Sequence, residues 1–238
     1  MKKGPNATES VHLMGSTAVI LMAKAPQPGT VKTRLCPPLS PAEAAELSRC
    51  FLLDALERLR ALEGVAPVLA YTPANGRAFF AEVAPDFALQ PQPEGDLGQR
   101  MAGCLEQLVA QGYTDLVLTG SDLPTLPTAY LQQAVDLLSN SRLDVVLGPS
   151  EDGGYYLIGM HHVHRELFHD MPWSTDQVFA KTLQRAGAKG LQVACVPPWF
   201  DVDTAADLNR LHAALRQTPA DVAPNTRQFF LTHYDRKI

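Results

Sequence analysis

TAVILMAKAPQPGTVKTRLCPPLS, residues 17–40, joins a continuous apolar run to a loop that is rich in Lys, Arg, Pro and Gly. The apolar run lacks the alternation of a half-exposed strand, which indicates a strand buried on both faces, as in a parallel sheet. The segment from Val11 to Ala42 contains no Asp or Glu, although the whole chain has a net charge of −5. The positive charge after this strand therefore needs a local explanation.

The chain of 238 residues has an ordinary globular composition, with 46% hydrophobic and 19% charged residues. No apolar run approaches the roughly 20 residues that span a bilayer, and the acidic net charge argues against a broad nucleic-acid surface. The four cysteines show no short CxxC pairing, so we expect reduced thiols in a cytoplasmic protein. Residues 1–16 lack the apolar centre of a signal peptide and are expected to be a flexible leader.

Strand and helix patterns alternate along the rest of the chain. We expect strands at 17–23, 66–72, 87–90, 115–120, 143–150, 154–160 and 191–197. We expect helices at 40–62, 76–84, 97–112, 128–140, 175–187 and 204–217. Ser40 and Glu43 form a capping-box pattern at the start of the first of these helices. This alternation predicts one α/β domain over residues 17–238, with a mostly parallel sheet, helices on both faces and the C-terminal tail packed on it.

Ligands of such sheets bind beyond the carboxyl ends of the strands. The first loop there offers Lys24, Gly29, Lys32 and Arg34. Glycine lets backbone N–H groups approach an anion closely, while Lys and Arg side chains suit phosphate. The loop lacks the spacing of a P-loop and there is no GxGxxG fingerprint. A phosphate site is our interpretation, and a solvated loop with chance charges is the alternative.

AKAPQPGTVKTRL (23–35) resembles the first loop of a bacterial family of nucleotide-dependent transferases with the glycosyltransferase-A type fold. That family is related to 2-phospho-L-lactate guanylyltransferase and to the molybdenum-cofactor nucleotidyltransferases. Further motifs of the family follow in order as DLGQRM (96–101), GSDLP (120–124), GPSEDGGYYLIG (148–159), PWST (172–175) and DVDTAADL (201–208). The resemblance implies the same fold and a nucleotide-dependent transfer reaction.

Two acidic loops supply candidate metal ligands. The resemblance implies that Asp122 binds a Mg²⁺ or Mn²⁺ ion that bridges to nucleotide phosphates, and that Asp203 is the second ligand, with Asp201 a weaker candidate. Hard divalent cations prefer one or two carboxylates together with phosphate oxygens and water. The alternatives are a turn residue for Asp122 and a helix cap for Asp203, a position that Thr204 could also fill.

Other motif residues each allow more than one role. Asp152 precedes Gly153 and Gly154 in a turn that fits a hairpin, but a second glycine also suits backbone lying against a ligand, and Asp152 could serve as a general base. Trp173 could stack on a sugar or base, or anchor the core, and Ser174 or Thr175 would cap the helix that follows. Arg100 lies at a helix start and is a candidate phosphate or acceptor contact. The histidines at 161, 162 and 164 offer an HxxH spacing, which alone is a weak metal signal, and no cysteine lies nearby.

The favoured hypothesis is transfer of a nucleotidyl group from a nucleoside triphosphate to a small phosphorylated or hydroxylated acceptor. Lys24, Lys32 and Arg34 would hold the phosphates, and three cations suit a triphosphate. The alternatives are glycosyl transfer from a nucleotide-sugar and a non-catalytic nucleotide-binding module. The nucleotide base, the acceptor and the oligomeric state stay open, and a homo-oligomer is one option.

Overall fold

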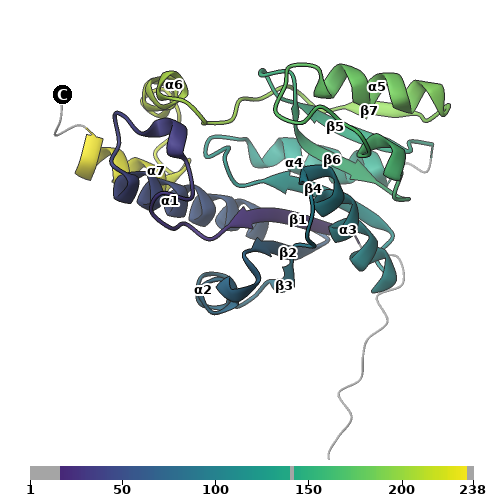
Figure 1. The fold of residues 1–238 in the computed structure, drawn as a ribbon, viewed down its shortest axis with the longest axis horizontal. Helices are drawn as coiled ribbons and strands as arrows, with labels where there is room; N and C mark the ends of the chain where they lie inside the picture. The colour runs from purple at the N-terminus through teal and green to yellow at the C-terminus, as the bar shows by residue number, and fades with distance from the viewer. Residues whose placement is uncertain (1–16, 140–141, 235–238) are drawn as a thin grey trace, which may run out of the picture.

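The computed structural model describes residues 17–139 and 142–234, so the expected leader lies outside the described residues. Seven strands form one sheet in the order β3-β2-β1-β4-β6-β5-β7 (Figure 1). They are β1 (Thr17–Lys24), β2 (Val65–Thr72), β3 (Ala88–Pro91), β4 (Asp115–Gly120), β5 (Val145–Pro149), β6 (Tyr155–Met160) and β7 (Val193–Cys195). Strand β6 runs antiparallel to β4 and β5, and the other neighbouring pairs are parallel. The predicted mostly parallel sheet is confirmed.

Helices cover both faces of the sheet, as the alternating pattern predicts. On one face lie α1 (Pro41–Arg60), α2 (Arg77–Val83) and α4 (Thr128–Leu138), whose apolar side chains share a core with the strands. On the other face lie α3 (Leu97–Ala110) and α5 (Val178–Ala188) with a second core. Strand β1 contributes side chains to both cores and is buried along nearly its whole length, which explains its continuous apolar sequence. Short 3₁₀ turns are η1 (Thr33–Leu35), η2 (Ala74–Gly76) and η3 (Arg165–Leu167).

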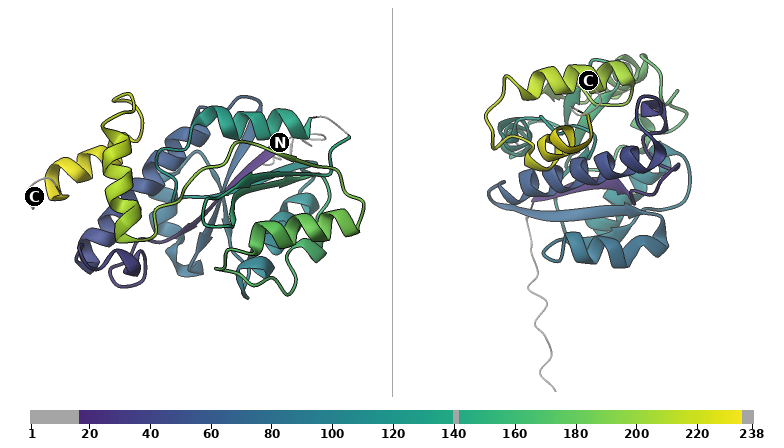
Figure 2. Two further views of the ribbon diagram at one scale, coloured as in Figure 1. Left: turned by 90° about the horizontal axis from the view of Figure 1, so that it is seen from above. Right: turned by 90° about the vertical axis from the view of Figure 1, so that its left-hand side faces the viewer.

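A third core joins α1 to the C-terminal part of the chain. It contains α6 (Ala205–Leu215), α7 (Pro224–Phe229) and a π-helical turn, η4 (Phe230–Tyr234). Figure 2 shows these elements together at one end of the molecule, beside α1 and beyond the sheet. Phe229 and Phe230 are buried there, whereas Leu231 is exposed. Helix α1 therefore supports both the sheet and a C-terminal helical lobe, defined here as α6, α7 and η4.

The helix starts test the local predictions. Ser40 caps α1 with a complete capping box to Glu43, as the sequence indicates. The predicted start at residue 175 is wrong, because α5 begins at Val178. Neither Ser174 nor Thr175 caps it, since the N-cap residue is Gln177 and no side chain makes a capping bond. Ser174 has a φ of 64°, so the chain turns sharply before the helix forms.

The strand order places the candidate residues. The chain adds β2 and β3 on one side of β1, and then β4 on its other side. Parallel sheets bind ligands where the order reverses in this way, because the loops after the two central strands diverge. The basic loop after β1 and the Asp122 loop after β4 thus meet at one edge. None of the helices in the described ranges is long and apolar enough to cross a membrane.

Candidate active site

A cleft of about 770 Å³ opens at the carboxyl ends of β1 and β4 and at the amino end of the antiparallel strand β6. It brings together most of the residues that the sequence singled out, although they are spread over 180 positions of the chain. The predicted residues that line it are Lys24, Lys32, Arg34, Arg100, Asp122, Asp152, Gly154, Trp173, Asp201 and Asp203. Gly29 and Gly153 are not among its lining residues.

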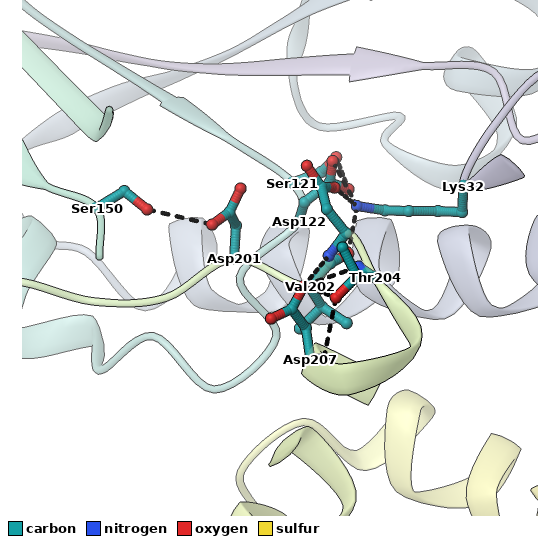
Figure 3. A network of polar contacts seen from close by, with 9 residues as sticks. Lys32, Ser121, Asp122, Ser150, Asp201, Val202, Thr204 and Asp207 are labelled. Carbon is teal, nitrogen blue, oxygen red and sulfur yellow. Dashed lines mark hydrogen bonds and ion pairs between the residues drawn. The ribbon is translucent and has the colours of Figure 1, made fainter. Parts of the chain in front are cut away.

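Lys32 lies at the centre of the site and joins the basic loop to both acidic loops (Figure 3). Its Nζ is 2.8 Å from an Oδ of Asp122, 2.8 Å from an Oδ of Asp203 and 2.7 Å from the carbonyl oxygen of Val202. An ammonium has three N–H donors, so all three are used in this arrangement. The predicted contact between Lys32 and phosphate therefore stays a prediction, and the structure gives Lys32 a different set of partners.

The electrostatics of this cluster keep Lys32 charged. Burial by itself lowers the pKa of Lys32, but the Asp122 and Asp203 carboxylates outweigh this effect and raise the pKa above its ordinary value. The Lys32 side chain is only 5% exposed, whereas those of Asp122 and Asp203 are 42% and 45% exposed. The two carboxylates therefore contact a buried cation on one side and face the cleft on the other.

The alternative role of Asp203 as a helix cap is not what the structure shows. Thr204 is the N-cap of α6, and its hydroxyl accepts a hydrogen bond from the backbone N–H of Asp207. The Asp207 carboxylate accepts hydrogen bonds from the backbone N–H groups of Thr204 and Asp203. With the capping positions filled by Thr204 and Asp207, the Asp203 side chain is left for Lys32 and the cleft.

Two further carboxylates lie along the same wall. Asp201 accepts a hydrogen bond from the Ser150 hydroxyl at 3.1 Å. Burial, followed by the nearby charges of Asp203 and Asp152, raises the pKa of Asp201. Asp152 accepts a hydrogen bond from the backbone N–H of Gly154 at 2.9 Å, inside the predicted hairpin turn between β5 and β6. This wall is therefore strongly acidic, which favours a cation at its surface.

Cationic side chains that line the same cleft remain available to a ligand. Among the described residues, the Lys24 side chain donates only to the carbonyl oxygen of Thr30, within the exposed basic loop. Arg34 forms no side-chain hydrogen bond or ion pair with any residue that the structure describes. Arg100 makes one long bond of 3.4 Å to the Asp96 carbonyl, at the start of α3. These three cations, unlike Lys32, can offer donors to an anion in the cleft.

The two predicted glycines outside the cleft have local conformational reasons. Gly29 has a φ of 76°, which shapes the turn in the basic loop. Gly153 has a φ of 89°, and a Cβ there would lie 2.3 Å from the backbone oxygen of Asp176. Its carbonyl oxygen accepts a hydrogen bond from Phe179 N–H in α5. Gly153 thus docks the hairpin turn against the segment before α5, and Gly154 is the glycine that faces the cleft.

Trp173 combines the two roles that the sequence left open. It lines the cleft, and its ring also packs edge-on against Tyr155 at a centroid distance of 6.3 Å. The indole comes so close to Gly98 in α3 that a Cβ at that position would lie 2.7 Å from the ring. Trp173 therefore closes the cleft between β6 and α3, with part of its ring in the core.

Sequence reasoning missed some residues of the site. Gln92 lines the cleft, and its amide N–H groups donate to the carbonyl oxygens of Ala23 and Ala70. Thr72 also lines it, at the end of β2. Both follow or end strands, so the same rule that selected the other loops could have found them. The carbonyl of Val202, a Lys32 partner, carries no signal in the side-chain sequence.

The histidine run lies outside the site. His161 Nδ1 is 2.8 Å from an Oδ of Asp115 at the start of β4, at the opposite edge of the sheet from the cleft. Within residues 17–139 and 142–234, no three or more His, Cys, Asp or Glu residues gather closely enough to hold a metal ion by themselves. All four cysteines are free. A metal ion in the cleft would therefore take its remaining ligands from water or from a substrate.

The donor set of the cleft fits such a shared metal. Asp122 and Asp203 are held side by side by one ammonium, and each side chain is more than 40% exposed to the cleft. Mg²⁺ in nucleotide sites is commonly bound by one or two carboxylates, with phosphate oxygens and water completing its coordination. Two protein carboxylates in a cleft that also contains available cationic side chains match that pattern.

Comparison with known proteins agrees with this geometry. Over 193 residues the chain is 28% identical to 2-phospho-L-lactate guanylyltransferase of Methanothermobacter thermautotrophicus, covering 76% of this chain and 78% of that enzyme. A Desulfovibrio desulfuricans G20 protein, provisionally assigned as a nucleotide-diphospho-sugar transferase, is 31% identical. It superposes with a TM-score of 0.82 over 90% of this chain and 95% of that one.

A more distant structure shows the fold alone. A cytidylyltransferase from Leptospira borgpetersenii serovar Hardjo-bovis (strain JB197) is 14% identical, with a TM-score of 0.55 over 93% of this chain and 96% of that one.

Residues 55–175 match a family described as uncharacterized proteins conserved in bacteria (DUF2064). The predicted resemblance and the predicted transferase class are both confirmed. The chain belongs to this bacterial family (DUF2064) and is a transferase with the nucleotide-diphospho-sugar transferase fold.

Proposed function

We propose that this protein is a metal-dependent nucleotidyltransferase, which moves a nucleotidyl group from a nucleoside triphosphate to a small phosphorylated or hydroxylated acceptor. One observation carries the proposal: the Asp122 and Asp203 carboxylates meet at Lys32, in a cleft that is also lined by Lys24, Arg34 and Arg100. A metal-bound polyphosphate needs this pairing of acids for the cation with cationic side chains for the phosphates. The guanylyltransferase relative supports the same reaction class.

The phosphates would bind to Lys24 and Arg34, since these side chains have unused donors. Arg34 can form a bidentate contact with two phosphate oxygens, and Lys24 adds a point charge. Lys32 would act mainly on the acids, because its three N–H donors already bind Asp122, Asp203 and Val202. In this proposal Lys32 holds the two carboxylates together. It contributes to catalysis by positioning them.

Asp122 and Asp203 would hold a Mg²⁺ or Mn²⁺ ion through the oxygens that face the cleft. When bound, that cation would offset the negative charge that builds up on the phosphates during transfer. An acceptor oxygen attacks the α-phosphorus, the bond from the α-phosphorus to the bridging oxygen breaks, and diphosphate leaves with the electron pair. The protein contributes chiefly orientation and charge stabilisation.

The acceptor would lie against the wall formed by Asp152, Gly154 and Trp173, on the β6 side of the cleft. A phosphate acceptor is already anionic and needs no base. A hydroxyl acceptor must lose a proton, and Asp152 is the carboxylate we assign to receive it. Arg100, with one weak internal bond, is placed to contact an anionic group on the acceptor.

Glycosyl transfer is the second candidate, because the 31% identical relative is assigned, provisionally, to nucleotide-diphospho-sugar transfer. The same metal site would then stabilise a leaving nucleoside diphosphate. The two candidates differ in the donor, which has three phosphates in one case and a diphosphate linked to a sugar in the other. Binding of the donor alone therefore separates them before any acceptor is known.

Thermal unfolding with a panel of donors tests the proposal. ATP, GTP, CTP, UTP and several nucleotide-sugars are each added with Mg²⁺, with Mn²⁺ or with a chelator. A donor at about 100 times its Kd adds roughly 2.7 kcal/mol to the unfolding free energy. At about 2–4 °C per kcal/mol for a chain of this size, that is a rise of about 5–10 °C in Tm. We expect a metal-dependent shift with one triphosphate. Shifts with nucleotide-sugars alone would favour glycosyl transfer, and no shift with any donor would refute both.

A further inference from the structure

Helix α1 buries a full positive charge that the proposed chemistry does not use. Arg58 is only 8% exposed, in the second half of the helix, where α1 packs on the sheet. Burial lowers its pKa to about 10, although Asp54 one turn earlier raises it again in part. At neutral pH the side chain is still a charged guanidinium, and burying a charge is costly unless it is paired and hydrogen-bonded.

The partner of Arg58 lies in the loop that carries Asp122. Its Nη2 donates a hydrogen bond of 2.7 Å to the carbonyl oxygen of Pro124. The same loop is fixed at two other points, because the Asp122 carbonyl oxygen accepts a hydrogen bond from Val202 N–H and the Leu123 side chain is buried. The backbone from Asp122 to Pro124 is therefore held from both ends.

Charge compensation is not a sufficient reason for this contact. Asp54 is the acid whose charge raises the pKa of Arg58, but its carboxylate oxygens bind the backbone and side chains of Asn225 and Thr226 in α7. Among the described residues, the Arg58 side chain makes one hydrogen bond, to the Pro124 carbonyl oxygen. The buried cation is thus used on a backbone carbonyl two residues from Asp122.

We propose that Arg58 is a positioning residue that fixes the Asp122 carboxylate for metal binding. This inference rests on the proposed function, since it assigns Asp122 to the metal. Arg58 does not touch the cleft, and its effect passes through the backbone of Asp122–Pro124. Groups that orient a metal ligand in this way commonly change metal affinity or activity by 10–100-fold when they are removed.

The test measures Mn²⁺ binding to the protein without nucleotide, by the electron paramagnetic resonance signal of free Mn²⁺. Arg58→Met should weaken Mn²⁺ binding about tenfold and leave metal-free nucleotide binding unchanged, since Lys24 and Arg34 are untouched. Arg60→Met is the matched control on the same helix, because Arg60 pairs with Asp86 at the surface. Phe80→Leu controls for a general loss of stability, because Phe80 is a fully buried core residue of α2.

Arg58→Met with wild-type Mn²⁺ affinity would overturn the inference. So would an equal loss of affinity in Phe80→Leu at a matched fall in Tm. If Arg58→Met does not fold, Arg58→Lys replaces it, since a lysine keeps the charge but loses the guanidinium geometry. A roughly threefold or larger loss there supports the inference, and an unchanged Kd refutes it. A wild-type protein that binds no Mn²⁺, with or without a nucleotide, would instead refute the metal site itself.

Discussion

The Lys32 cluster and the Asp54 cluster both bury one charge, but they treat its partners differently. Asp54 is 4% exposed and accepts four hydrogen bonds from Asn225 and Thr226, and Thr226 is itself fully buried. Lys32 is equally buried, yet its partners Asp122 and Asp203 are each more than 40% exposed to the cleft. One cluster is closed on all sides and the other is open on one.

The difference separates a structural role from a functional one. In a closed cluster the central group bonds only to other residues of the protein, so its role is to hold elements together, here α7 on α1. An open cluster keeps carboxylate oxygens for a further cation. Burial of the central charge alone would not reveal this, because Lys32 and Asp54 are alike in that respect. The exposure of the partners distinguishes them.

Matched Asp→Asn substitutions give the largest expected effects. They test whether one cluster serves turnover and the other serves stability. Asp122→Asn removes a proposed metal ligand, so metal-dependent turnover should fall by about 100-fold or more, while Tm changes little. Asp54→Asn turns an amide N–H₂ toward buried donors, so the unfolding free energy should fall by about 2–4 kcal/mol. Its turnover, measured well below its Tm, should fall less than tenfold. Steady-state kinetics with Mg²⁺ and urea unfolding measure both.

The comparison fails if the two phenotypes are not separated in this way. Normal metal-dependent activity in Asp122→Asn would remove Asp122 from the metal site. A stable Asp54→Asn protein would show that α7 is held by its apolar contacts, with little contribution from the carboxylate. Circular dichroism of each purified variant supplies the control that the folded state is retained.

Lys32→Met should lower stability by about 2–3 kcal/mol at pH 7, since it leaves Asp122 and Asp203 facing each other without a cation. The value lies below the usual cost of breaking a buried pair because the carboxylates are partly exposed. Mg²⁺ should restore more stability to this variant than to the wild type. The folded-state pKa of Lys32 is raised above 10.5, so its contribution is complete below that pH and is lost as the pH rises further.

Urea unfolding at several pH values, with and without Mg²⁺, checks this prediction. The difference between wild type and Lys32→Met should be constant from about pH 7 to 9 and shrink above about pH 10.5. A difference that already shrinks at pH 8–9 would mean that the pKa of Lys32 is lowered in the folded protein. Equal Mg²⁺ effects on both proteins would argue against a cation site at the two carboxylates.

Much of this arrangement follows from the sequence because it rests on local rules. The continuous apolar run of β1 predicts a strand inside a parallel sheet, and the Ser40–Glu43 pattern predicts the start of α1. The strand-end rule then selects Asp122 and Asp203 without any knowledge of distance. Each of these predictions depends on neighbours in the chain, or on a topology that the alternation of elements already implies.

The contacts of the site could not be predicted in the same way. Lys32 bonds to atoms about 170 positions away, one of which is a backbone oxygen. Its charge suits phosphate and carboxylate equally well, so residue type alone cannot choose between them. The late start of α5 has a similar cause. The Phe179 N–H in the first turn of α5 donates to the Gly153 carbonyl oxygen, a tertiary partner that the local pattern around Thr175 does not predict.

The adjacent glycines of the hairpin turn give the smallest expected effect and repeat the comparison on a local scale. Gly153 has a positive φ, and a Cβ there would lie within 2.6 Å of three backbone atoms of Asp176. Gly153→Ala should therefore cost about 1–2 kcal/mol. A Cβ on Gly154 would meet little besides an Asp152 oxygen at 3.2 Å, so Gly154→Ala should cost less than about 1 kcal/mol and instead raise the KM of the acceptor. Urea unfolding and steady-state kinetics of both variants decide. Equal stability losses would mean that Gly154 is also a structural glycine, closed on all sides like Asp54.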